Sequence, residues 1–208
     1  MRWLVEHRQG LAHGLMALPV LVLAARWAMM IAGSDPRFVG LSAEPIDYTI
    51  NYLGLWAIRF LILSLAITPL RGLTRWSWLA PLRRPLGLWA FACALLHLSV
   101  YFMLDQLGSL ALLWESIAKH PFILLGMGAF TLLLPLALTS TRAAMRRVGA
   151  RRWQALHRLV YVAAILAAIH FILRVKGFQP EPWIYAGLIA LALALRLFPA
   201  RAVRRSTA

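Results

Sequence analysis

The stretch Trp153–Arg174 reads WQALHRLVYVAAILAAIHFILR and decides the fold, because it joins an apolar run to two histidines. Its apolar part, with the residues just before it, is long enough to cross a hydrocarbon core of about 30 Å. His157 and His170 lie thirteen positions apart, which places them about 20 Å apart along a helix axis. An imidazole inside a membrane span is costly without a partner. The stretch therefore predicts a membrane helix with a functional histidine near each membrane face.

Composition supports a membrane protein. Of the 208 residues, 62% are hydrophobic, and the mean hydropathy is +0.72. The net charge of +15 does not indicate nucleic-acid binding, because the positive residues stand in short blocks between apolar runs. Cys93 is the single cysteine, so neither an intrachain disulfide nor a CxxC metal site is possible. The sequence also lacks a Gly-rich nucleotide fingerprint.

Six apolar segments predict six membrane helices. Their ranges are 10–31, 52–70, 86–104, 121–139, 154–173 and 183–198. The connections are short and no linker interrupts the chain. We therefore expect an all-α, integral membrane six-helix bundle that forms a single domain over residues 1–208.

The charges of the connections alternate along the chain. Arginines concentrate in the N-terminal segment, the second connection, the fourth connection and the tail, whereas the other connections hold most of the acidic residues. Loops rich in Lys and Arg stay on the cytoplasmic side of a membrane. This pattern predicts that both termini are cytoplasmic and that the protein is a multi-pass protein of a bacterial inner membrane.

The fourth connection, TSTRAAMRRVGARRWQ (139–154), predicts a cytoplasmic helix that Ser140 or Thr141 can cap. Its basic face has two interpretations: contact with anionic membrane lipid, or a docking surface for an electron donor.

The embedded histidines fall into two depth classes. His97 and His170 belong to the outer, periplasmic half of their spans, whereas His13 and His157 lie just inside the cytoplasmic edge. A hydrogen-bonded structural role is the usual state of a lone histidine in a membrane helix. Two depth-matched pairs instead predict axial ligands for two stacked haems, with His97 and His170 on one iron and His13 as the candidate partner of His157.

Iron with two histidine ligands has no open position, so this ligation suits electron transfer rather than substrate chemistry. Arg59 lies within a span, where it can extend to the interface or pair with haem propionates. The turn TRWSWLAPLRRP (74–85) is typical of an interfacial aromatic belt. Its arginines Arg75, Arg83 and Arg84, with the neighbouring indoles, are also candidates to hold a flavin.

Three stretches carry a resemblance to a known family. RRPLGLWAFACALLHLSVY (83–101), residues 136–176 and PWIYAGLIALALALR (182–196) resemble the MsrQ family, formerly called YedZ, above all in TST, WQ-x-LH-x-x-VY and IH-x-x-x-x-VK. These are haem-binding membrane subunits of periplasmic methionine-sulfoxide reductases, within the ferric-reductase-like transmembrane superfamily.

This resemblance implies heme b (b-type haem), a bound FMN and electrons from the quinone pool or a cytoplasmic flavin reductase. It also implies delivery of those electrons to a periplasmic molybdopterin subunit, MsrP, which repairs oxidised proteins. The family's haem-ligand positions match His97, His157 and His170. NADPH oxidases of the same superfamily carry two histidines on each of two helices, but the third span here holds only His97. Depth alone makes His13 the candidate for the missing ligand.

The sequence thus predicts an electron-transfer subunit without substrate chemistry of its own. One alternative is a cytochrome b561-like or ferric-reductase protein that reduces a small acceptor directly. Another, of a different class, is a non-redox membrane anchor or transporter whose histidines are merely packed.

Overall fold

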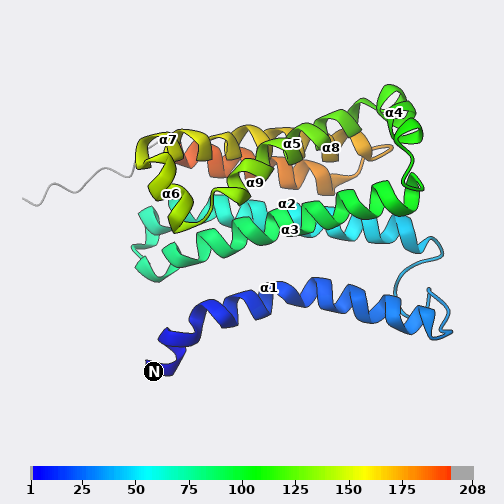
Figure 1. Ribbon diagram of the computed structural model, residues 1–208, viewed down its shortest axis with the longest axis horizontal. Helices are drawn as coiled ribbons and strands as arrows, with labels where there is room; N and C mark the ends of the chain where they lie inside the picture. The colour runs from blue at the N-terminus through cyan, green and yellow to red at the C-terminus, as the bar shows by residue number, and fades with distance from the viewer. Residues whose placement is uncertain (1, 198–208) are drawn as a thin grey trace, which may run out of the picture.

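The computed structural model describes residues 2–197, with side chains for residues 10–196, and within this range the chain forms only helices and connections (Figure 1). The α-helices are α1 (Arg2–Ile31), α2 (Pro45–Thr74), α3 (Arg83–Val100), α4 (Leu110–Lys119), α5 (Pro121–Leu138), α6 (Arg142–Val148), α7 (Ala150–His157), α8 (Leu159–Arg174) and α9 (Pro180–Leu197). A 3₁₀ segment η1 (Ser77–Leu82) precedes α3, and a π-helical turn η2 (Tyr101–Asp105) follows it.

Five of the described helical segments are long and apolar enough to cross a membrane, and they match the first five predicted spans. They are Gly10–Ile31, Pro45–Thr74, Ser77–Asp105, Pro121–Leu138 and Ala150–Arg174. The predicted sixth span corresponds to α9, which packs against α2 and α8. Its last predicted residue, 198, and the basic tail lie outside the described residues.

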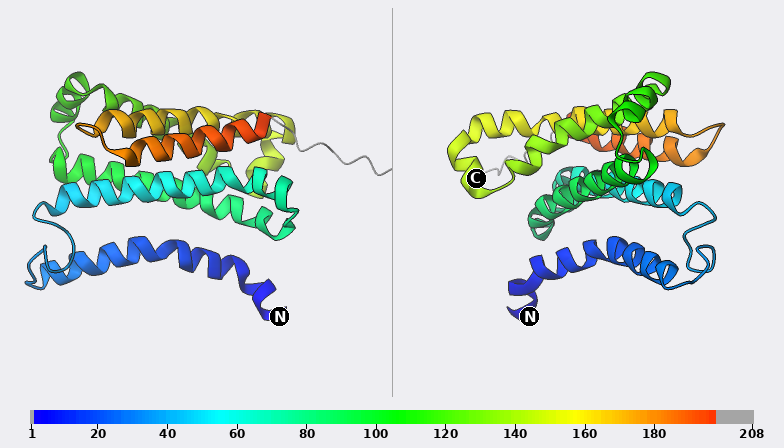
Figure 2. Two further views of the ribbon diagram at one scale, coloured as in Figure 1. Left: turned by 180° about the vertical axis from the view of Figure 1, so that it is seen from behind. Right: turned by 45° about the vertical axis from the view of Figure 1, so that its right-hand side comes forward.

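The helices form three groups in space. The pair α2 and α3 lies in the middle, with α1 on one side and α5, α7, α8 and α9 on the other (Figures 1 and 2). The most extensive contacts join α2 to α3 and α5 to α8, while α1 contacts the bundle only lightly. Each of these two pairs holds one embedded histidine, His97 on α3 and His170 on α8.

The connections gather at two opposite ends, as the charge pattern requires. The N-terminus, the turn between α2 and α3, the α6–α7 segment and the end of α9 share one end, and α4 with the α1–α2 connection lies at the other (Figure 1). The arginine-rich connections therefore share one end of the molecule. The 105–120 segment was predicted as a plain connection, but α4 forms within it, and Ser109 caps this helix by accepting the Leu112 N–H at 3.3 Å.

Small buried side chains let the helices of the core approach one another closely. Ala163 and Ala164 of α8 are fully buried, as is Cys93 of α3. Arg196 attaches α9 to this core, because its guanidinium donates to the Leu65 carbonyl of α2 and to the Tyr161 hydroxyl of α8. The Arg196 guanidinium thus holds α9 against both α2 and α8.

Candidate haem-binding site

A cavity of about 880 Å³ opens among α2, α3, α5 and α8. This is within the range of about 300–1,000 Å³ that is usual for cofactor and ligand sites. Its deep walls are built from small residues of all four helices: Gly54, Ala57, Ala90, Ala94, Gly126, Ala129 and Ala167. The shortage of bulky side chains at these positions is what leaves the space open.

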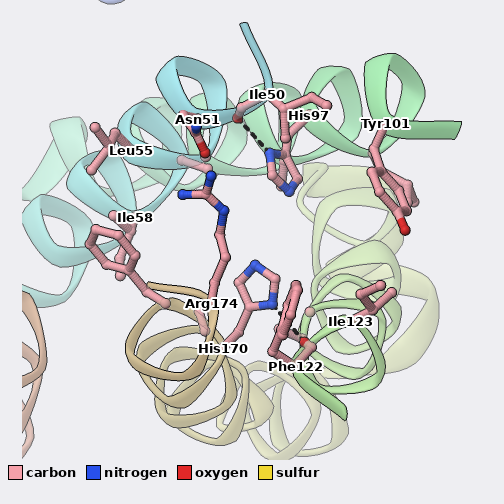
Figure 3. A pocket seen from close by; sticks show the side chains of 18 of the residues that line it. Ile50, Asn51, Leu55, Ile58, His97, Tyr101, Phe122, Ile123, His170 and Arg174 are labelled. Atoms are coloured by element: carbon pink, nitrogen blue, oxygen red, sulfur yellow. Dashed lines mark hydrogen bonds between the residues drawn. The ribbon is translucent and has the colours of Figure 1, made fainter. Parts of the chain in front are cut away.

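His97 of α3 and His170 of α8 face each other across this cavity (Figure 3). Their ring centroids are 6.3 Å apart and their planes meet at 88°. The Nδ1–H of His97 donates to the Ile50 carbonyl at 2.7 Å, and that of His170 donates to the Phe122 carbonyl at 2.6 Å. Because a carbonyl only accepts, Nδ1 of each ring carries the proton and Nε2 keeps a free lone pair on the cavity side.

This donor set fits iron in a porphyrin. A metal–imidazole bond is about 2 Å long and the ring adds roughly 1 Å, so two imidazoles on one metal have centroids about 6 Å apart. Two histidines complete an octahedral site only when four further ligands come from elsewhere, as a macrocycle provides. The Nδ1–H bonds to carbonyls are the outer-sphere contacts that orient histidine ligands in metal sites. Cavity, spacing and protonation therefore all fit a haem.

The polar groups of the cavity gather at its outer mouth. Arg174 extends into the cavity near Asn51 (Figure 3), and its guanidinium lies 3.7 Å from the Asp47 carboxylate. Lys176 also lines this mouth. Arg174 was not among the predicted site residues, although it follows His170 by four positions and so shares its helix face. A macrocycle with two carboxylates would find its cation here.

Arg59, the predicted propionate partner, is placed elsewhere. Its Nε–H donates to the Tyr185 hydroxyl at 2.6 Å, and the guanidinium lies 3.8 Å from Glu181 and 5.1 Å from the Trp56 ring centroid. It does not line the cavity. Arg59 instead joins α2 to α9, because the sequence fixes its depth in the span but not the direction in which it points.

His157 occupies a second polar position, at the end of α7. Its ring stacks on Trp153 with centroids 3.8 Å apart, and its Nδ1 bonds to the Trp153 carbonyl at 3.1 Å. The indole N–H of Trp153 donates to the Thr139 carbonyl at 2.8 Å, while Thr141 caps α6 as predicted. The TST and WQ-x-LH motifs therefore work together. They hold His157 with a buried Nε2 that has no hydrogen-bond partner among the described residues.

His13 is not brought near His157. Its Nδ1 accepts a hydrogen bond from the Trp89 indole of α3 at 3.0 Å, so a neutral His13 carries its proton on Nε2. The layer of α2 and α3 lies between α1 and the α7–α8 group (Figures 1 and 2). The matching depth suggested a shared iron, but the two histidines lie on opposite sides of this layer.

Because His13 and His157 lie apart, their replacement should have different effects on haem binding. We expect His157→Ala to lower haem content and His13→Ala to leave it unchanged, measured as haem per chain after purification. Equal losses of haem in the two variants, with no further loss in the double variant, would instead support one iron shared by His13 and His157.

The three predicted flavin arginines lie at the arginine-rich end of the molecule and are exposed. Arg75 ends α2 in a left-handed conformation with φ 59°, and Arg83 and Arg84 begin α3. Beside them the indoles of Trp76 and Trp78 stack with centroids 5.9 Å apart. The predicted elements are therefore neighbours in the chain and share one surface.

The comparisons with known proteins agree with this architecture. Residues 53–168 match the family described as the ferric reductase like transmembrane component, which makes the chain a ferric-reductase-like membrane protein. Three relatives are each named "Protein-methionine-sulfoxide reductase heme-binding subunit MsrQ". That of Rhodospirillum rubrum is 50% identical over 82% of this chain and 83% of its own length. The relative from Xanthomonas euvesicatoria is 42% identical over 95% of this chain and 89% of its own length. The relative from Brucella anthropi is 46% identical over 83% of this chain and 76% of its own length. The chain belongs to the MsrQ family.

Proposed function

We propose that this chain is the electron-carrying membrane subunit of a methionine-sulfoxide reductase and that His97 and His170 are the axial ligands of a b-type haem. The observation that carries the proposal is the pair of facing imidazoles, each with Nδ1–H committed to a backbone carbonyl. Haem supplies a one-electron carrier when it is bound there. The test is whether the purified protein holds b-type haem and loses it when either histidine is replaced.

The residues of the chain have separate tasks in this proposal. His97 and His170 hold the cofactor from opposite helix pairs, and the small residues of α2, α3, α5 and α8 admit the flat ring. Arg174 and Lys176 neutralise the propionates at the outer mouth, where Asp47 already lies beside Arg174. The small apolar residues of the deep walls would shield a bound haem from water, and the Nδ1–H of each imidazole is committed to a carbonyl, so these residues would offer no proton for substrate chemistry.

The name of the relatives supports a role beside a methionine-sulfoxide reductase subunit. The relatives are subunits of methionine-sulfoxide reductases, and the proposed partner is the periplasmic molybdopterin subunit MsrP. Electrons enter from the quinone pool or a cytoplasmic flavin reductase. His157 serves a second cofactor near the cytoplasmic side. The exposed Arg75, Arg83 and Arg84 bind the phosphate of FMN beside the stacked indoles. The first alternative, direct reduction of a small acceptor, shares the haem but not the partner.

The direction of transfer depends on topology in the bacterial inner membrane. We expect reporter fusions at Arg75, Arg147 and the C-terminus to read as cytoplasmic, and fusions in the 33–50 and 105–120 connections to read as periplasmic, because the arginine-rich connections stay inside. A periplasmic C-terminus would reverse the orientation and place the His97–His170 cavity near the cytoplasm.

A further inference from the structure

The two proposed ligand histidines are held in the same way by two different helices. His97 bonds to the carbonyl of Ile50, four residues before Gly54 on α2, and His170 bonds to the carbonyl of Phe122, four residues before Gly126 on α5. In each case the histidine lies on the second helix of a tightly packed pair and the glycine lies on the first. The site is thus built twice from one local pattern.

Helix geometry explains the glycine. The Cα–Cβ bond of a helical residue leans toward the N-terminus, so the Cβ at position i+4 covers the carbonyl of residue i. An imidazole that approaches this carbonyl from the side must pass over position i+4. The carbonyl has two lone pairs and can accept the histidine in addition to its own helical N–H. A Cβ at position i+4 narrows this path, whereas glycine leaves it open.

The distances show how closely each ring lies against its glycine. A Cβ at Gly126 would stand 2.8 Å from Nδ1 and 2.9 Å from Cε1 of His170. A Cβ at Gly54 would stand 3.1 Å from Nδ1 and 3.3 Å from Cε1 of His97. Both are shorter than ordinary contacts, and the clash at Gly126 is the more severe. Alanine is the better helix former, so helix propensity does not account for either glycine.

We propose that Gly54 and Gly126 are positioning residues for the two axial imidazoles. They let each ring reach its backbone carbonyl, and so they fix the Nδ1–H bond, the direction of Nε2 and the 88° angle between the ring planes. This inference rests on the proposed haem ligation by His97 and His170.

A methyl group at either glycine should change the haem as well as the packing. The displaced ring loses part of its N–H···O bond, which lowers the basicity of the ligand and stabilises the ferric state less. The midpoint potential should therefore rise. In low-spin ferric haem the largest g value is greatest when the two imidazole planes are perpendicular. A change in ring angle should therefore lower that g value in the electron paramagnetic resonance spectrum.

The test compares Gly54→Ala and Gly126→Ala with two matched control variants. Gly128→Ala adds the same methyl to α5 at 3.5 Å from Leu166, and Gly87→Ala adds it to α3 at 3.6 Å from Ser64, both ordinary contacts. For Gly126→Ala we expect haem affinity to fall about tenfold, the scale typical of lost outer-sphere contacts to a metal ligand, and haem content per chain to fall with it. Gly54→Ala should keep more haem, with a raised potential and a lowered g value. The two controls should match wild type.

If Gly126→Ala does not fold, Gly54→Ala still decides the test. The clash at Gly54 is smaller, so this variant should keep its haem, and the potential and g values of that haem can be measured. Wild-type potential and g values in Gly54→Ala would overturn the inference, as would equal shifts in the control variants. Failure of the proposed function looks different: the wild-type protein would then hold no haem, or His97→Ala and His170→Ala would keep all of it.

Discussion

We expect wild-type protein to carry b-type haem, and His97→Ala and His170→Ala each to lose most of the haem held between these two histidines, because loss of an outer-sphere contact alone lowers the affinity of a metal site about tenfold or more. The physical reason is that removal of one imidazole leaves the iron with a single protein ligand and an open position. The remaining histidine holds the macrocycle weakly, and any haem that stays should become five-coordinate. Pyridine haemochrome quantitation per chain and the dithionite-reduced spectrum measure both effects.

Ser99→Ala is a suitable control for this experiment. Ser99 lies two residues from His97 on α3, is exposed, and donates only to the Leu95 carbonyl of its own helix at 2.8 Å. It should keep wild-type haem and spectrum. Full haem content in both histidine variants would exclude the His97–His170 site, and a purified wild-type protein without a Soret band would favour the non-redox anchor or transporter.

The second large effect concerns catalysis. Supplied with a chemical reductant, the protein alone should reduce methionine sulfoxide no faster than the reductant does without protein. Both axial positions of the proposed haem are filled by imidazoles, so the sulfoxide oxygen has no iron to bind. The cations at the cavity mouth, Arg174 and Lys176, suit the pairing of carboxylates rather than oxygen transfer.

Anaerobic sulfoxide consumption, measured with and without the periplasmic MsrP subunit, tests this expectation. Turnover should require the partner. Turnover by the membrane chain alone would make it an enzyme in its own right. Reduction of a small acceptor such as a ferric chelate at a comparable rate, with no response to the partner, would favour the ferric-reductase alternative.

The sequence was sufficient to predict that His97 and His170 lie at one level along their helices. Apolar runs predicted the first five spans, and the positions of His97 and His170 along theirs predicted that they meet at one level. Depth follows from the rise of about 1.5 Å per residue and needs no knowledge of neighbouring helices. This is why the histidine pair could be predicted before the fold.

The direction in which each side chain points from its helix could not be predicted in the same way, because what a side chain meets depends on which helices are neighbours. Arg59 lies at a suitable depth but faces α9, while Arg174 points into the cavity. His13 matches His157 in depth, yet α1 packs on the far side of α2 and α3. Gly54 and Gly126 carry no polar signal at all, and their role is visible only once the rings of His97 and His170 lie over them.

The most direct test of the central claim is a measurement of haem reoxidation. Protein reduced under anaerobic conditions is mixed with methionine sulfoxide, with oxidised MsrP, or with both, and the haem absorbance is followed over time. We predict that excess sulfoxide together with a catalytic amount of MsrP reoxidises all of the haem, whereas sulfoxide alone leaves the haem reduced. Reoxidation by sulfoxide alone, or haem that stays reduced when both are present, would contradict an electron-transfer subunit that serves this partner.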